Sequence, residues 1–418
     1  MMRRRQITQS VVANQRRHKP DYQIILSVGL LMLFGLIIMY AIGPQRANVL
    51  NAAHNTSYYT DTYFVLKQTF SLVLAIVAFI ALSVIPFARM REKAGTILAI
   101  GFILCALLVV AGNLLHIDAI AKCTLGACRW FQLGPFGSFQ PAEFLKFGML
   151  LYIAGFLGVR YKEGKLDDIQ QTILPVSLMT LSALFFIVIL QKDMGTGIAL
   201  TSTVASILVV SGIKAKTLGV LALAGIAFIV SMILIAPHRM ERIVTFIQGD
   251  DHSSVEAEDN NYHIKNAKIA LGTGGLFGLG IGNSIQATGY LPEAINDSVF
   301  AIIGETFGFV GVVIVLVFFT VLLMRLLKIT ERLPDMTSRL VVAGDFGWLG
   351  SHVILNVASM IGVFPLTGIT LPLLSFGGTS MLFIAGVLGL VFQLSRYTTH
   401  EPVNITKEAS YETARSGR

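Results

Sequence analysis

Long apolar runs, each about as long as the hydrocarbon layer of a bilayer is thick, dominate this sequence. A membrane-spanning helix needs about 20 consecutive apolar residues, and runs of that kind recur along the whole chain. They begin near Tyr22, Phe64, Ala94, Pro141, Thr172, Met194, Leu218, Asp297, Leu340 and Ser380. Hydrophobic residues make up 54% of the chain and charged residues 13%, which excludes an ordinary soluble domain. The sequence therefore predicts an all-α polytopic membrane protein with about ten transmembrane helices.

Basic residues gather at alternate ends of these runs. They precede the first run, recur in every second connection and follow the last run: Arg3, Arg4, Arg5, Arg16, Arg17, Lys19, Arg89, Arg91, Lys93, Arg160, Lys162, Lys165, Lys214, Lys216, Arg325, Lys328, Arg332, Arg339, Arg396, Lys407, Arg415 and Arg418. Because cytoplasmic loops carry an excess of Lys and Arg, we expect both tails, residues 1–21 and 397–418, to be cytoplasmic. The net charge of +8 indicates attraction to anionic membrane lipids. Nucleic-acid binding is not indicated, because the basic clusters lack interleaved aromatic residues.

The connection between the seventh and eighth runs, residues 237–296, is far longer than a usual loop. The basic clusters place this loop outside the cytoplasm. Its first part, Asp250 to Asn260, is polar and acidic, and we expect it to be mobile. Tyr262 to Ala270 and the glycine-rich Gly272 to Gly282 favour a short amphipathic or re-entrant element with a flexible backbone at the membrane interface. No predicted strand precedes these glycines, so a nucleotide-binding loop is rejected.

The segment Gly289 to Glu305, GYLPEAINDSVFAIIGE, places two carboxylates at the mouth of the eighth run. Glu293 and Asp297 are four residues apart, so any helix through them would present both on one face. Acids at the edge of the bilayer are usually functional. Structural interpretations stay open beside this one. Pro292 can begin a short helix with Glu293 as a first-turn acid, and Asp297 can be the N-cap of the eighth helix.

Other polar residues interrupt the fourth and sixth runs and the last outer loop. Glu143 and Lys146 are three residues apart and can pair on one helix face. This pair suits a buried ion pair that locks two helices as well as it suits substrate binding. Asp193 opens the sixth run, where it can cap the helix or face a pocket. Ser375 ends the last outer loop and either approaches a substrate or only makes the turn.

A further acid, Glu305, lies about two helical turns beyond Asp297 in the eighth run. A buried acid at that depth needs a partner or a wet cavity. Asp345 and His352, seven residues apart in the ninth run, can supply the partner, although plain packing between helices is the interpretation we favour.

The cysteines and histidines indicate little chemistry. Cys123 and Cys128 share one outer loop, five residues apart, and can form a local disulfide in an oxidising exterior. Cys105 falls within the third run, where we expect inert packing. The eight histidines show no zinc-binding spacing such as HExxH, so no structural zinc is predicted.

Four blocks of this sequence resemble the SEDS family (shape, elongation, division and sporulation), the FtsW/RodA/SpoVE proteins. GYLPEAINDSVFAIIGE resembles the family's YLPEAxxDFIFAxIGEE signature, with Ser298 in place of an aromatic residue. In the family's order, residues 127–146 (ACRWFQLGPFGSFQPAEFLK) resemble GxxRWxxLGxFxxQPSEFxK, residues 191–196 (QKDMGT) resemble QPDLGT, and residues 365–380 (PLTGITLPLLSFGGTS) resemble PxTGxxLPFxSYGGSS. The resemblance runs over residues 22–396, which are interpreted as one ten-helix membrane domain. Residues 282–284 are more similar to the FtsW than to the RodA members.

The resemblance implies a peptidoglycan glycosyltransferase of the bacterial cytoplasmic membrane that polymerises lipid II at the outer face. It also implies a class B penicillin-binding protein as partner, with other division or elongation proteins. The family's essential aspartate corresponds to Asp297, which can act as the base for the attacking hydroxyl or hold a divalent cation such as Mg²⁺ or Mn²⁺ at the leaving undecaprenyl pyrophosphate. An inverting reaction is expected, because an α-linked donor gives a β-linked glycan.

Arg129 and Lys146 lie toward the outer side, where that pyrophosphate would sit, and are the phosphate-binding candidates. Glu143, Glu293, Asp193, Glu305 and Ser375 complete the substrate-binding candidates. Two other functions remain open: a lipid II flippase, since intramembrane acids also suit a transport path, and a non-catalytic division scaffold. A transporter needs its site near the midplane, whereas Asp297 and the long loop place the chemistry at the outer face, which favours the enzyme.

The predicted orientation can be tested by cysteine labelling in intact cells. In Ser253→Cys, we expect a membrane-impermeant maleimide to label the new thiol without permeabilisation, above the background of the unsubstituted chain, because the long loop lies outside. Ser410→Cys, in the C-terminal tail, serves as the control and should react only after permeabilisation. Protection of Ser253→Cys in intact cells would reverse the orientation and, with it, the outer placement of Asp297.

Overall fold

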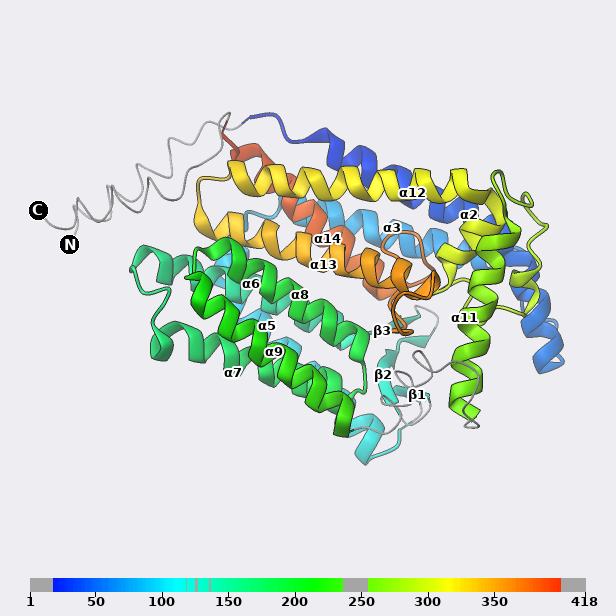
Figure 1. Cartoon of the computed structure of the whole chain (residues 1–418), viewed down its shortest axis with the longest axis horizontal. Helices are drawn as coiled ribbons and strands as arrows, with labels where there is room; N and C mark the ends of the chain where they lie inside the picture. The colour runs from blue at the N-terminus through cyan, green and yellow to red at the C-terminus, as the bar shows by residue number, and fades with distance from the viewer. Residues whose placement is uncertain (1–17, 118, 125–126, 135–136, 236–254, 400–418) are drawn as a thin grey trace, which may run out of the picture.

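The computed structural model describes residues 18–117, 119–124, 127–134, 137–235 and 255–399. Most of its helices run roughly along one long axis (Figure 1). Helix α2 (Tyr22–His54) begins and helix α14 (Gly378–Leu394) ends at one end of this axis, and a small sheet and helix α11 (Val255–Thr273) lie toward the other. The sequence places these two groups of residues on opposite sides of a membrane, so the axis corresponds to the expected membrane normal.

The first half of the chain forms antiparallel helices and the sheet. Its elements are α2 (Tyr22–His54), α3 (Tyr63–Val84), α4 (Phe87–Glu92), α5 (Ala94–Val109), η1 (Val110–Leu114), β1 (Ala121–Thr124), β2 (Ala127–Gln132), β3 (Ser138–Phe139), α6 (Pro141–Lys162), η3 (Ile169–Ile173), α7 (Leu174–Leu184), η4 (Phe185–Leu190), α8 (Met194–Ser211) and α9 (Ala215–Ile235). The second half is helical and comprises α11 (Val255–Thr273), η6 (Gln286–Thr288), α12 (Val299–Arg332), α13 (Met336–Met360), α14 (Gly378–Leu394) and η7 (Ser395–Tyr397).

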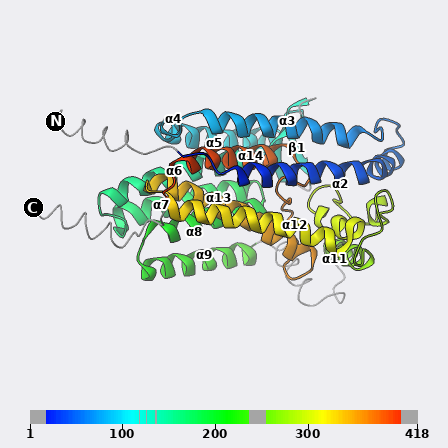
Figure 2. The same ribbon diagram turned by 90° about the horizontal axis from the view of Figure 1, so that it is seen from above.

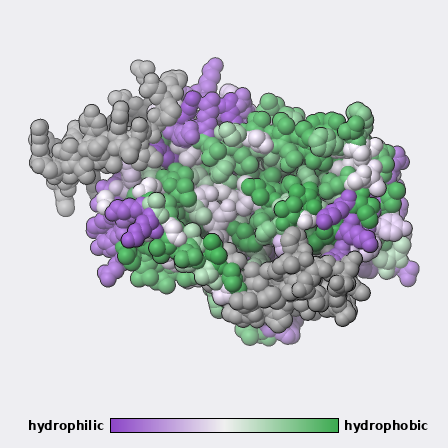
Figure 3. Space-filling model, in the orientation of Figure 1, coloured by the Kyte–Doolittle hydropathy of each residue, from purple (hydrophilic) through white to green (hydrophobic). Residues whose placement is uncertain are grey.

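Nine helices of the described residues are long and apolar enough to cross a membrane, and α9 is a further apolar helix of 21 residues. Figure 3 shows hydrophobic side chains over the middle of one face, with hydrophilic residues gathered toward its ends. Because a bilayer solvates apolar side chains, this exposed apolar surface is expected of a membrane protein. The predicted polytopic helical fold is confirmed.

Helices α13 and α14 form the centre of the bundle. Seen at 90° to the first view, they lie between α3 on one side and α9 on the other (Figure 2). The spans differ in the buried share of their most apolar 18-residue stretch. This share is 83% in Gly378–Tyr397, which contains α14, and 78% in α13, but only 17% in α3. Polar residues of α13 and of the loop before α14 are therefore shielded from lipid and are free to build a site inside the protein.

The three strands form an antiparallel sheet in the order β1-β2-β3. Cys123 of β1 is the register partner of Cys128 of β2, and the two form a disulfide. The sequence alone indicated only that this disulfide was possible, and in the structure the two cysteines form it. The sheet leads directly through Gln140 into α6, so it positions Arg129 close to the start of that helix.

Helix α12 is broken at Gly308, whose backbone (φ 68°, ψ −166°) is not helical. The glycine-rich segment packs across this break and restores the lost hydrogen bonds. The amides of Leu279 and Gly280 donate to the Glu305 and Thr306 carbonyls, and the amides of Phe309 and Val310 donate to the Gly275 and Leu276 carbonyls. The segment from Gly272 to Gly282, expected to be flexible, is thus held by its backbone against α12, which satisfies groups that lipid could not.

The described part of the long loop begins with a helix. Residues 237–254, and with them Ser253 and the first five residues of the acidic stretch, lie outside the described residues. Residues 255–260 of the acidic stretch form the start of helix α11. Their sequence, VEAEDN, places acids near a helix N-terminus, where the helix dipole favours them. Helix α11 packs on α12 and α13 and runs across the long axis of the bundle (Figure 1).

The close packing of the glycine-rich segment gives a prediction about stability. A Cβ atom on Gly274 would lie 1.8 Å from the Gly304 carbonyl oxygen, whereas one on Gly272 would meet nothing within 4 Å. We expect Gly274→Ala to lower the free energy of unfolding by about 1–3 kcal/mol, as overpacking does, seen as a lower melting temperature in detergent. Gly272→Ala, the matched control two residues earlier in the last turn of α11, should be neutral or slightly stabilising. Equal melting temperatures would contradict the observed packing.

Candidate active site

The segment with Glu293 and Asp297 forms successive turns between η6 and α12. Glu293 adopts a positive φ of 49°, and its carbonyl accepts hydrogen bonds from the amides of Asn296 (2.9 Å) and Ser298 (3.2 Å). The prediction that Glu293 and Asp297 share a helix face is therefore wrong. Helix α12 begins at Val299 with Ser298 as its cap residue, so Asp297 is not the N-cap either. Local helix hydrogen bonds are replaced here by contacts with other elements.

Three neighbouring elements hold this turn. From α13, the buried amide of Asn356 donates one hydrogen to the Asp297 carbonyl (2.6 Å) and the other to the Ile369 carbonyl (2.7 Å). The Phe376 amide donates to the Ile295 carbonyl (2.8 Å).

Helix α11 supplies the third contact. His263 Nε2 lies 2.6 Å from Ser298 Oγ, which itself donates to the Pro292 carbonyl (2.8 Å). Since that hydroxyl donates its single proton to Pro292, it accepts from His263. Ser298 stands where the family signature has an aromatic residue, and in this chain it forms a hydrogen bond with His263. The half-buried Asp297 sits on a fixed backbone at the end of α12 farthest from the start of α2 and the end of α14 (Figure 1).

Glu305 supports the same segment from inside the bundle. Its buried carboxylate accepts hydrogen bonds from the Ser284 hydroxyl and from the amides of Ile285 (3.0 Å) and Gln286 (3.2 and 3.3 Å). The expected partner of this acid therefore exists, but it is the start of η6 and neither Asp345 nor His352. Glu305 fixes the chain just before the motif, and this arrangement makes it a positioning residue.

Lys146 lies at the centre of a buried polar cluster. Its ammonium is 2.8 Å from Glu143 Oε1, 3.3 Å from His352 Nε2 and 4.5 Å from the centre of the Trp348 ring. His352 Nδ1 lies 3.4 Å from the Thr370 carbonyl, so its Nδ1 carries the proton and its Nε2 accepts from Lys146. The predicted Glu143–Lys146 pair is confirmed as an ion pair. Both side chains are buried, and Glu143 Oε2 has no hydrogen-bond partner among the described residues.

The N-termini of α6, α8 and α14 meet beside this cluster. Asp193 caps α8 by accepting from the Thr196 amide (3.0 Å) and also accepts from Gln140 Nε2 (2.9 Å). The Gln140 amide in turn donates to the hydroxyl of Thr379 in the first turn of α14 (3.3 Å). The helix-cap interpretation of Asp193 is thus borne out. Because each helix N-terminus carries partial positive charge, three of them together favour an anion.

Arg129 reaches this junction from β2. Its Nε donates to the Gln191 carbonyl (3.3 Å) and its Nη2 to the Lys192 carbonyl (2.7 Å). These two bonds leave other N–H groups of the guanidinium for a ligand. Arg129 therefore holds the loop before α8 and presents positive charge next to Asp193.

Ser375 makes a turn. Its hydroxyl accepts from the Leu371 amide (2.8 Å), and it is buried, so substrate contact would require movement. Positive φ values cluster in these same loops: of five such non-glycine residues in the described chain, three are Lys192, Glu293 and Leu373. Strained backbone of this kind persists where surrounding structure enforces it, often at functional sites.

Helix α13 joins the two halves of the site. Asn356 and His352 are one turn apart on it, the first bonded to Asp297 and the second to Lys146, and both bonded to the loop before α14. The structure thus brings Asp297 and the Glu143–Lys146 pair to one helix, whereas Glu305 lies on a supporting side. Sequence reasoning missed Asn356, His263 and Gln140. The four-residue spacing of His352 and Asn356 in an apolar run was the available signal.

A metal site made by the protein alone is not present in the described part of the chain. No group of three or more His, Cys, Asp or Glu residues there is arranged to hold an ion. Mg²⁺ usually takes only one or two carboxylates and completes its shell with water and substrate phosphates. Asp297 therefore fits a cation only if substrate oxygens supply most of the ligands.

Comparison with known proteins decides the family. The pattern of the FtsW/RodA/SpoVE family, described as cell cycle proteins, matches residues 22–400. This chain belongs to that family. Stage V sporulation protein E of Bacillus subtilis (strain 168) is 29% identical over 386 residues, which cover 92% of this chain and 99% of the relative. A probable peptidoglycan glycosyltransferase FtsW of Taylorella equigenitalis (strain MCE9) is 31% identical over 370 residues, covering 88% and 94%.

Solved structures of the family have the same fold. A chain from a peptidoglycan synthase complex, in a study of how polymerization and crosslinking are coordinated, superposes with a TM-score of 0.70 at 25% identity and covers 91% of this chain and 99% of that chain. The rod shape determining protein RodA of Thermus thermophilus gives a TM-score of 0.64 at 25% identity, with coverage of 91% and 98%. The family membership predicted from four sequence blocks is confirmed.

The ion pair gives a prediction that separates a structural from a functional role. We expect Lys146→Met to lower the free energy of unfolding by about 3–5 kcal/mol, because it leaves the Glu143 carboxylate buried and uncompensated. The double variant Glu143→Gln/Lys146→Met should regain much of this loss in a thermal melt.

Lys162→Met is the matched control, since that lysine lies at the other end of α6 and is largely exposed, 4.0 Å from Asp335. It should change stability by less than about 0.5 kcal/mol. If Lys146→Met melted like Lys162→Met but did not polymerise lipid II, the pair would be functional and not structural.

Proposed function

We propose that this protein is a peptidoglycan glycosyltransferase that polymerises lipid II at the outer face of the cytoplasmic membrane. The observation that carries the proposal is Asp297, a half-buried acid on a backbone fixed by Asn356, at the end of the bundle opposite the start of α2 and the end of α14. The names of the FtsW relatives support the activity. The basic clusters support the orientation, with both tails in the cytoplasm and α11 and the sheet outside.

Asp297 acts as the general base in this proposal. The acceptor sugar hydroxyl attacks the anomeric carbon of the lipid-linked donor, and its proton passes to the Asp297 carboxylate as the new C–O bond forms. The bond between the anomeric carbon and undecaprenyl pyrophosphate breaks on the opposite face, so the configuration inverts. The two electrons of that bond leave with the pyrophosphate.

The leaving pyrophosphate is stabilised where α6, α8 and α14 begin. Three helix N-termini, Arg129 and the nearby Lys146 give this junction positive character. Arg129 contacts the phosphate through its remaining N–H groups. Lys146 is buried, and its contacts with Glu143 and His352 fix α6 against α13. It therefore positions the junction, and it would touch the phosphate directly only if the cluster opened.

The remaining candidates fall into two groups. Glu293 is exposed beside Asp297, and we assign it a contact with the incoming sugar. Asp193, Glu305 and Ser375 are engaged by backbone groups and position the loops that surround the substrate. As an alternative to acting as the base, Asp297 would hold Mg²⁺ or Mn²⁺, which would stabilise the charge of the leaving pyrophosphate.

A flippase remains the second candidate because Asp345, Glu143 and Lys146 are ionisable groups buried within membrane-spanning helices. The position of Asp297 favours polymerisation, and so does its connection through α13 to a junction suited to pyrophosphate. A non-catalytic scaffold would have no need of either feature. We also propose a class B penicillin-binding protein as the partner, in line with the peptidoglycan synthase complex that shares the fold.

Asp297→Asn tests the base directly. We expect polymerisation of purified lipid II, followed by gel separation of glycan strands, to fall on the order of 10²- to 10⁴-fold because the amide cannot accept the proton. Its free energy of unfolding should change little, since the backbone carbonyl that Asn356 binds is retained. Asp61→Asn, an exposed acid in the loop between α2 and α3 at the same end, is the control and should polymerise normally. Undiminished turnover by Asp297→Asn would exclude the assignment.

A further inference from the structure

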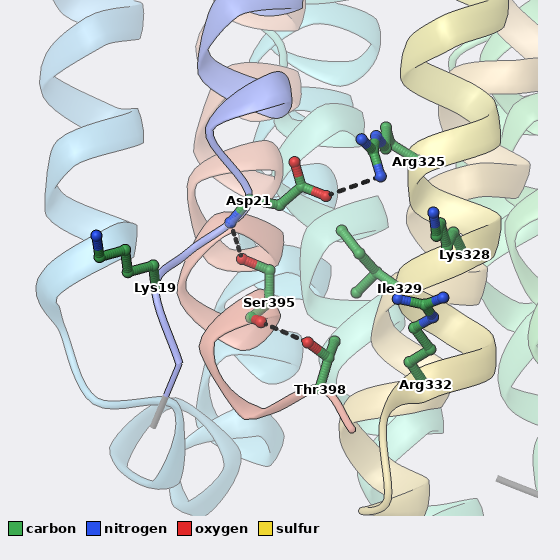
Figure 4. A pocket seen from close by; sticks show the side chains of 8 residues that line it. All are labelled: Lys19, Asp21, Arg325, Lys328, Ile329, Arg332, Ser395 and Thr398. Atoms are coloured by element: carbon green, nitrogen blue, oxygen red, sulfur yellow. Dashed lines mark hydrogen bonds and ion pairs between the residues drawn. The ribbon is translucent and has the colours of Figure 1, made fainter. Parts of the chain in front are cut away.

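A basic pocket lies at the opposite end of the bundle from Asp297. It is bordered by the start of α2, the end of α12 and the chain after α14 (Figure 4). The lining residues are Lys19, Asp21, Arg325, Lys328, Ile329, Arg332, Ser395 and Thr398, and the cavity measures about 160 Å³. This is smaller than pockets for drug-sized ligands, which hold roughly 300–1,000 Å³. The size suits one small polar group whose remainder lies outside.

The charge of the pocket is mostly uncompensated. Asp21 is the one acid in its lining: Oδ1 caps α2 by accepting from the Gln23 amide (3.0 Å), and Oδ2 lies 3.6 Å from Arg325. Within the described chain, no acid lies within 4.0 Å of the charged nitrogens of Lys19, Lys328 or Arg332. Three basic side chains of the lining, those of Lys19, Lys328 and Arg332, therefore have no acidic partner among the described residues.

These basic residues repel one another as they stand. Arg325, Lys328 and Arg332 follow at intervals of three and four residues, which places all three on one face of α12. Like charges at that spacing destabilise a helix, although the C-terminal dipole offsets part of the repulsion in the last turn. An anion bound between Lys328 and Arg332 would remove this repulsion.

The hydroxyl groups of the lining are already occupied. Ser395 Oγ accepts from the Asp21 amide (2.9 Å) and donates to the Phe392 carbonyl, while Thr398 Oγ1 donates to the Ser395 carbonyl (3.0 Å). These bonds tie the start of α2 to the end of α14, as Figure 4 shows. Recognition of a ligand therefore depends on charge and on the donors of Arg and Lys, which favours a phosphate.

The pocket lies where the lipid-facing surface ends. On α12, the exposed apolar residues Val317, Val321 and Met324 precede Lys328 at intervals of four, three and four residues, on the same helix face. On α2, Tyr22 and Leu26 are exposed directly after Asp21. Acyl chains of a lipid can therefore lie along these side chains while its headgroup enters the pocket.

We propose that this pocket binds the phosphodiester headgroup of an anionic phospholipid, held by Lys328 and Arg332. The bound phosphate lies at the end of α12, beside the start of α2 and the end of α14, far from the polymerisation site. It neutralises the row of cations on α12 and so stabilises the fold. Basic pockets between transmembrane helices on the cytoplasmic side are suited to such headgroups.

The experiment measures the melting temperature of the purified full chain in a neutral detergent. It is titrated with dioctanoyl phosphatidylglycerol, dioctanoyl phosphatidylcholine or glycerol 3-phosphate. We expect saturable stabilisation by the phosphatidylglycerol and much weaker effects of the other two. Since each basic residue near an anionic lipid contributes about fivefold in affinity, Lys328→Gln/Arg332→Gln should weaken the apparent affinity roughly 30-fold.

Arg91→Gln/Lys93→Gln is the matched control. It removes one Arg and one Lys from exposed positions at the same end of the bundle, outside the pocket, and should keep the wild-type affinity. If the double pocket variant fails to fold, the single variant Lys328→Gln, at an exposed position of α12, should still show a loss of about fivefold. Equal losses in pocket and control variants would overturn the site. Full stabilisation by glycerol 3-phosphate alone would overturn the lipid as its ligand.

Discussion

The side-chain amide of Asn356 is the contact on which the site depends. This buried amide donates both hydrogens to backbone carbonyls, one of Asp297 and one of Ile369, so its loss would leave both carbonyls without this donor. Asn356 belongs to α13, a largely buried helix, so it transfers the rigidity of the bundle to two loops that have little regular structure. One turn away, His352 links the same loop to Lys146. Asp297, the acid that we propose as the catalytic base, is thereby positioned on a loop as firmly as it would be on a helix.

The bundle separates two electrostatic environments along its length. At the end of the bundle that carries the sheet, the N-termini of α6, α8 and α14 converge beside Arg129, so positive charge comes from helix dipoles and one guanidinium. At the other end, Lys and Arg side chains cluster around the end of α12. The first arrangement suits a pyrophosphate that must leave, because it contains few full charges to retain it. The second suits a phosphate that stays bound. Both follow from helix direction together with the distribution of basic residues.

The sequence predicts the fold better than the site. Apolar runs give the helices within a few residues, since hydropathy and length suffice for a span, and the Glu143–Lys146 pair follows from helical spacing. Helical spacing gives the wrong prediction for Glu293 and Asp297, because this segment forms turns that are held by contacts with α11, α13 and the Phe376 amide. It fails again at Gly308, because the break in α12 depends on a segment some 30 residues earlier that pairs with it. Long-range hydrogen bonds, which no local pattern encodes, decide these places.

The most direct test of glycan polymerisation by this chain uses the wild-type protein alone in proteoliposomes that contain fluorescent lipid II. The strands are separated on a gel, and the leaflet of the remaining lipid II is assayed in the same vesicles. If the outer-face site is a polymerase, glycan strands should appear without any other glycosyltransferase, with release of undecaprenyl pyrophosphate. Movement of lipid II between leaflets with no glycan strands, either alone or after addition of a class B penicillin-binding protein, would contradict it and identify a flippase.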